Sequence, residues 1–204
     1  MNANRNIVQI LLLVFAVLIA ACSGNKKDAT NQEAAIEKEQ PTVSQGTARE
    51  IKTFDNVDPS VKSQINGFLA DYFVLNKSLI EDNQDRARAA AKKLSETVSK
   101  FDMSKLAGEQ MDFYHQQLAK LNQGLKGIDQ SADIEETRVE LSTVSDAMYA
   151  LVKAYHPNDS ELYLQFCPMA KNGEGANWIS NTKEIINPYM GQRMLKCGNT
   201  KETL

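Results

Sequence analysis

The chain has 204 residues and a formal net charge of -3, with 24% charged and 42% hydrophobic residues. This length suits one domain with a sizeable core, and the mixed composition is unlike that of a disordered chain. The charge excludes a strongly basic nucleic-acid binder, because no surplus of Lys and Arg exists to neutralise phosphates. Of the three cysteines, Cys22 lies near the N-terminus, whereas Cys167 and Cys197 lie in the last quarter.

Residues 1–21 have the pattern of a lipoprotein signal peptide. Arg5 precedes an apolar run, residues 10–21, that is too short to cross a hydrocarbon core of about 30 Å. The run ends in Ile19-Ala20-Ala21-Cys22, which resembles the lipobox of bacterial lipoproteins. We therefore expect export, lipidation of Cys22 and anchoring at the inner or outer membrane, with the folded domain in the periplasm. An ordinary signal peptide or an uncleaved anchor is the alternative.

Residues 22–57 are rich in Asn, Lys, Glu, Gln and Thr and have few apolar side chains. Such a composition cannot offset the entropy lost on ordering the chain. We predict a flexible tether between the lipid and the folded domain.

The next hundred residues predict four helices. Asp58-Pro59 is a helix start, with a capping side chain followed by proline at the first helical position. Apolar residues then recur at three- and four-residue spacing, which gives each helix one apolar stripe; the four stripes cover residues 61–79, 87–101, 111–128 and 134–155. The connections are short, so we predict an all-α domain, an antiparallel four-helix bundle within residues 58–200.

The tail, residues 156–200, has a different pattern. Alternation over residues 162–167 predicts one short strand, and the rest is expected to be irregular and packed on the bundle. The tail contains Cys167-Pro168-Met169 and Met194-Leu195-Lys196-Cys197. Thiolate and thioether sulfur prefer soft ions such as Cu(I) or Ag(I), so these two cysteines and two methionines are the candidate metal ligands.

Two further residues of the tail are candidates for the same site. His156 offers an imidazole, although its place before a proline also suits the end of a helix. Trp178 either lies over a bound cation or fixes the tail to the bundle, and packing is the simpler role. The simpler alternative for the two cysteines is a disulfide, since exported chains with two remaining cysteines often link them. These alternatives remain open at this point.

Four blocks of the tail resemble the domain-of-unknown-function 3347 family, which includes bacterial lipoproteins and exported proteins. The blocks are Tyr163–Ala170, Gly175–Ser180, Asn187–Gly191 and Met194–Gly198. The family is similar to a domain appended to the C-terminus of copper/silver efflux membrane-fusion proteins, the periplasmic adaptors. The resemblance spans residues 58–200 and implies soft-metal handling by Cys167, Met169, Met194 and Cys197. Members commonly have an aromatic residue where Met190 stands, so Met190 is either an additional thioether or a packing residue.

The expected function is therefore a lipid-anchored periplasmic module that binds Cu(I) or Ag(I) and exchanges it with a heavy-metal efflux system. The alternative is a structural or protein-interaction module of the envelope, with a Cys167–Cys197 disulfide and no metal. An enzyme is not expected, because no nucleophile has a base, an orienting group and an oxyanion loop around it. The identity of the metal, the partner and the oligomeric state stay open.

Overall fold

The structure is a computed structural model that describes residues 51–157 and 160–204. The predicted signal peptide, the lipidation site Cys22 and the tether up to residue 50 lie outside the described residues. Among the described helices, none is long and apolar enough to cross a membrane.

The four predicted helices are present, and the start signal at Asp58-Pro59 acts as expected. The helices are α1 (Pro59–Ile80), α2 (Gln84–Ser99), α3 (Glu109–Gln130) and α4 (Ile134–Tyr155), with a short 3-10 turn at Met103–Lys105 before α3. The side chain of Asp58 accepts a hydrogen bond from the Ser60 amide at 2.8 Å, and Asn83 caps α2 in the same way. Each cap satisfies an amide that would otherwise lack a partner in the first turn.

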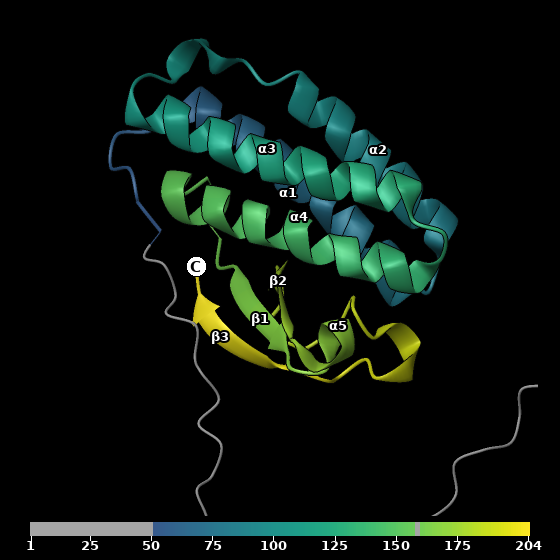
Figure 1. Cartoon of the computed structure of the whole chain (residues 1–204). Helices are drawn as coiled ribbons and strands as arrows, with labels where there is room; N and C mark the ends of the chain where they lie inside the picture. Colours follow the sequence, from purple (N-terminus) through teal and green to yellow (C-terminus); the bar gives the residue numbers. More distant parts are fainter. Residues whose placement is uncertain (1–50, 158–159) are drawn as a thin grey trace, which may run out of the picture. The chain divides into compact units, whose positions relative to one another are not determined.

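The apolar stripes of the four helices meet in one core. α3 packs along α4 and α1 along α2, and α2 also contacts α3 (Figure 1). The segment just before α1 joins this core, since Phe54 packs on Phe113 and Tyr155 and its amide donates to the carbonyl of Ala154. The packed region therefore begins before residue 58, the position at which the sequence pattern places the start of the domain.

Alanine substitution at two helical glycines is expected to change the free energy of unfolding in opposite directions. A Cβ at Gly124 in α3 would lie 2.7 Å from a methyl carbon of Val144 and 3.0 Å from its backbone nitrogen, whereas a Cβ at Gly67 in α1 would meet only a methyl group of Thr97, at 3.7 Å. We expect Gly124→Ala to lower the free energy of unfolding by about 1–3 kcal/mol through overpacking. Gly67→Ala should raise it by about 0.5–1 kcal/mol, the gain in helix propensity. Urea denaturation followed by circular dichroism measures both, and equal effects would contradict the close α3–α4 approach.

The tail forms a sheet, which corrects the expectation of an all-α domain with a mostly irregular tail. Its strands are β1 (Tyr163–Cys167), β2 (Ala176–Ser180) and β3 (Asn199–Thr203), all antiparallel in the order β2-β1-β3. Between them lie the one-turn helix α5 (Ala170–Gly173) and a 3-10 turn, Gly191–Arg193. The predicted strand is β1, and it is the central one. β2 packs on α4, with β3 on the outer side of the sheet (Figure 1).

The two faces of β1 differ from the predicted alternation. Gln165 is fully buried, and its side-chain nitrogen donates to the carbonyls of Thr182, Lys183 and Glu184 at 3.1–3.3 Å. Phe166 is only half-buried and lies under the Lys201 ammonium. The buried amide is tolerated because the loop after β2 turns three backbone acceptors toward it.

The outer edge of β2 is closed by side chains. Alternate residues of a strand direct their backbone groups to opposite edges, so those of Asn177 and Ile179 point away from β1. The hydroxyl of Tyr72 accepts from the Ile179 amide at 3.2 Å, and Asn76 donates to the Ile179 carbonyl at 3.3 Å. The Tyr189 hydroxyl donates to the Asn177 carbonyl at 2.5 Å. Side chains from α1 and the tail thus replace a fourth strand.

Candidate functional site

The structure brings the two predicted cysteines together. Cys167 is the last residue of β1 and is fully buried, while Cys197 precedes β3 and is partly exposed. Both are free thiols, and their Sγ atoms are 3.5 Å apart. That distance is a contact between two sulfur atoms and is longer than the roughly 2.05 Å of a disulfide bond.

A glycine allows this close approach. Gly198 follows Cys197 and has a φ of +140°. A Cβ there would lie 2.7 Å from the carbonyl oxygen of Phe166 and 3.0 Å from the ring of Trp178. Any larger residue would push the chain of Cys197 away from the end of β1, so the short distance between the thiols depends on the missing side chain.

One buried asparagine shapes the loop that carries Cys197. The side-chain nitrogen of Asn187 donates to the Cys197 carbonyl at 2.6 Å, and its oxygen accepts from the amides of Tyr189 and Met190 at 2.8 and 3.1 Å. The Asn187 amide also donates to the Leu195 carbonyl at 2.9 Å. This side chain is fully buried, so its bonds are protected from water and hold both ends of the loop.

The surroundings of Cys197, the partly exposed thiol, disfavour its thiolate form. Burial raises the pKa of the Cys197 thiol above its ordinary value, and the neighbouring Cys167 thiol raises it further. A thiolate at one sulfur would repel a second thiolate in contact with it, so the pair favours at most one negative charge. A cation between the sulfurs would remove that repulsion.

The two predicted thioethers lie at the surface, each within three residues of one of the cysteines along the chain. Met169 is 51% exposed and follows Cys167 by two residues, while Met194 is 39% exposed, with its carbonyl accepting from the Cys197 amide at 3.0 Å. Met190 is partly buried and lines, together with Met169, a groove of about 420 Å³ beside the N-terminal half of α4. Neither cysteine lines that groove, so the groove brings Met169 and Met190 together and includes neither thiol.

Trp178 and His156 have structural surroundings. Trp178 is 2% exposed, packs edge-on against Tyr189 with ring centroids 6.1 Å apart, and fixes the tail in the core. His156 is exposed and ends α4 in a left-handed conformation, with its amide bonded to the Val152 carbonyl. It lines a hollow of about 300 Å³ whose other residues include no cysteine or methionine.

Among the described residues, no group of three or more His, Cys, Asp or Glu side chains could hold a metal ion. The thiol pair therefore supplies two donors of that type, and any further donors for a soft ion would be the thioethers of Met169 and Met194. This donor set does not suit zinc, which takes three or four nitrogen, oxygen or thiolate ligands.

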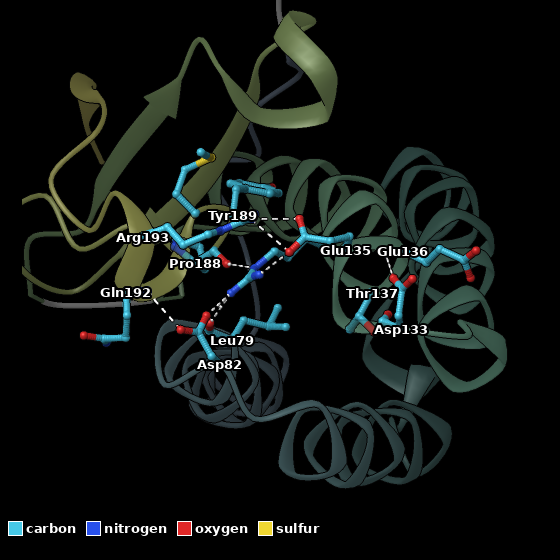
Figure 2. A network of polar contacts seen from close by, with 12 residues as sticks. Leu79, Asp82, Asp133, Glu135, Glu136, Thr137, Pro188, Tyr189, Gln192 and Arg193 are labelled. Atoms are coloured by element: carbon cyan, nitrogen blue, oxygen red, sulfur yellow. Dashed lines mark hydrogen bonds and ion pairs between the residues drawn. The ribbon is translucent and has the colours of Figure 1, made fainter.

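The sequence analysis did not identify Arg138, the residue that holds the tail against the helices. Its guanidinium is 4% exposed and donates to the carbonyls of Leu79 and Pro188 at 2.9 and 3.1 Å. It also pairs with the carboxylates of Asp82 and Glu135 (Figure 2). One side chain thus joins the end of α1, the start of α4 and the tail. Its position four residues after Ile134 and three before Leu141, on the apolar stripe of α4, was the available signal.

Around Arg138 the tail is bound by further polar contacts. Arg193 donates to both carboxylate oxygens of Glu135 at 2.9 Å, and the Gln192 amide donates to Asp82 at 3.3 Å (Figure 2). Asp82 and Glu135 therefore each bind the buried arginine and the tail at the same time. The loop that carries Cys197 is anchored to the helices through these shared acids.

Of the comparisons with known proteins, the one with family models matches the helical part of the chain. No curated protein and no solved structure matches it. Residues 68–160 match the model of a family described as "Protein of unknown function (DUF3347)". This match covers most of α1–α4 and ends before β1, so the thiol pair lies outside it. Over those residues the match supports assignment of the chain to this family of unknown function.

Proposed function

We propose that the reduced chain binds a soft monovalent ion, Cu(I) or Ag(I), through the Sγ atoms of Cys167 and Cys197. The observation that carries the proposal is the 3.5 Å between these atoms, since two ligands of one ion must converge on one place. Thiolate sulfur is polarisable and prefers soft ions to Mg²⁺ or Ca²⁺. Met169 and Met194 are exposed and within three residues of a cysteine along the chain, and their three rotatable bonds would let the thioethers turn toward the ion.

The proposed setting is the cell envelope. The lipobox at Cys22 and the resemblance to exported lipoproteins support a periplasmic domain on a lipid anchor, exchanging its ion with a heavy-metal efflux system. The four long helices, packed pairwise around one core, support an antiparallel four-helix bundle as the scaffold. The sheet then carries the thiols on one side of that scaffold.

The direct test is a Cu(I) competition titration against a coloured chelator, with the full chain reduced and kept under nitrogen. Every sample carries Cys22→Ser, so that only the paired thiols remain. We expect Cys167→Ser/Cys197→Ser to weaken binding by about 100-fold or more, and Met169→Leu/Met194→Leu by about tenfold, magnitudes seen when a metal site loses supporting groups. Binding should tighten as the pH rises, because the Cys197 thiol must lose its proton.

Met103→Leu is the matched control for the thioethers. Met103 is 38% exposed, like Met194, but lies in the connection before α3. Its replacement should leave the affinity unchanged. Equal, weak binding by the parent chain and the double cysteine variant would reject the proposal.

A second candidate function is favoured by the same sulfur contact. A Cys167–Cys197 disulfide would close the tail and leave a structural or protein-interaction module without metal. Closing the bond needs the sulfurs to approach by about 1.5 Å from their present separation. Peptide mapping of the protein as isolated separates the two functions, because only the second requires a linked pair in every molecule.

A further inference from the structure

The two thiols differ in access to solvent, although they touch. Cys167 has 0% of its surface exposed and sits in the apolar core with Ala176 and Trp178. Cys197 lies at the turn before β3 and is partly exposed. Cys197 is therefore the more accessible of the two cysteines to a reagent dissolved in water. Buried structural cysteines are inert for this reason.

From this asymmetry we propose that Cys197 is a site of reversible thiolation by low-molecular-weight disulfides and that Cys167 is its resolving thiol. The inference rests on the contact between the two sulfurs and on the unequal exposure of the two cysteines, and it needs no bound metal. It assigns an order to the oxidation of the pair, with Cys197 reacting first and Cys167 second.

The chemistry balances in two steps. In the first, the Cys197 thiolate attacks one sulfur of the small disulfide, forms a mixed disulfide and releases one small thiolate. In the second, the Cys167 thiolate attacks the Cys197 sulfur, forms the Cys167–Cys197 bond and releases the second small thiolate. The protein loses two electrons, the small disulfide gains them, and the two protons of the protein thiols end on the two small thiols.

The geometry favours the second step over the escape of the adduct. The Cys167 sulfur is 3.5 Å from that of Cys197, close to the separation of reacting atoms in a near-attack arrangement. The loop that holds Cys197 is fixed by the buried Asn187, so its sulfur stays beside Cys167. The mixed disulfide should therefore be short-lived in the parent chain.

The experiment uses the full chain with Cys22→Ser, incubated with oxidised glutathione and analysed by intact mass and peptide mapping. We expect the chain to lose two hydrogen atoms and to accumulate no adduct. Cys167→Ala should retain one glutathione on Cys197. Cys197→Ala should be modified at least about tenfold more slowly, because its remaining thiol is buried.

A second measurement avoids dependence on variants that change the core. A short pulse of iodoacetamide on the reduced Cys22→Ser chain should alkylate Cys197 at least about tenfold faster than Cys167. Equal alkylation of both cysteines, faster alkylation of Cys167, or a stable adduct on a chain with both thiols would overturn the proposal. No metal is present, so its failure is distinct from a failure to bind Cu(I).

Discussion

Arg138→Leu is expected to lower the free energy of unfolding by about 3–5 kcal/mol, the cost of removing one partner from a buried ion pair. The substitution leaves Asp82 without its cation and the carbonyls of Leu79 and Pro188 without this donor. Because these acceptors belong to α1 and to the tail, the tail should separate from the helices before they unfold. Urea denaturation followed by circular dichroism gives the loss, and limited proteolysis should show early cleavage between β2 and β3.

An exposed arginine in the first turn of α2 supplies the control. Arg86 pairs with Glu81 at 2.5 Å, and its side chain is 54% exposed. Arg86→Leu should change the free energy of unfolding by only about 0.2–1 kcal/mol. The double variant Arg138→Leu/Asp82→Asn should lose less than the sum of its single changes, by about 0.5–3 kcal/mol. Additive losses would mean that the two side chains are not coupled.

Trp178→Ala is the second large expected effect, a loss of about 3–5 kcal/mol of unfolding free energy. Among the described residues the indole is the largest fully buried side chain; it packs against Tyr189 and would be 3.0 Å from a Cβ added at Gly198. Domains of this size are stable by about 5–15 kcal/mol, so the loss is a large share of the total. Thermal and urea unfolding followed by circular dichroism measure this loss of stability, because circular dichroism does not depend on the tryptophan fluorescence that the substitution removes.

Trp178→Phe separates packing from a role at the ion. Phenylalanine keeps an aromatic ring in the core, so the loss of stability should be smaller than for alanine. If the indole only packs the tail, Cu(I) affinity should be the same in Trp178→Phe and the parent chain. A loss of affinity without a loss of stability would instead assign the ring to the metal site, the other role that its sequence position allows.

The helices could be predicted from the sequence because local signals determine them. Asp58 and Pro59 start α1, Asn83 starts α2, and apolar residues repeat with helical spacing over each segment. Two of the three strands carried no such signal. Every residue of β3 is polar and nearly all are exposed, so no alternation marks it. It forms a strand because β1 offers it backbone hydrogen-bond partners. β1 is distant from it in the sequence, so the local pattern of β3 does not reveal this pairing.

The candidate site was predictable in composition but not in geometry. The softness of sulfur singles out Cys167, Met169, Met194 and Cys197, and the structure places two of them in contact. The burial of one thiol and the exposure of both methionines depend on how the loop at Asn187 folds. Arg138 was missed because a charged residue on an apolar stripe ordinarily interrupts the stripe without a structural role. Only its tertiary contacts show that it holds the tail against the helices.

The side-chain bonds along the edge of β2 determine where the sulfur pair can lie. Apolar contacts between a sheet and a helix tolerate sliding, because they are not directional. Hydrogen bonds are directional: the Ile179 amide donates to the Tyr72 hydroxyl and the Ile179 carbonyl accepts from Asn76, so this contact does not tolerate sliding. A shift of β2 along α1 by one residue would present the wrong backbone groups and turn its side chains to the opposite face. The thiols are therefore held in a fixed position relative to α1, so a molecule that docks on the helices would meet them at one constant place.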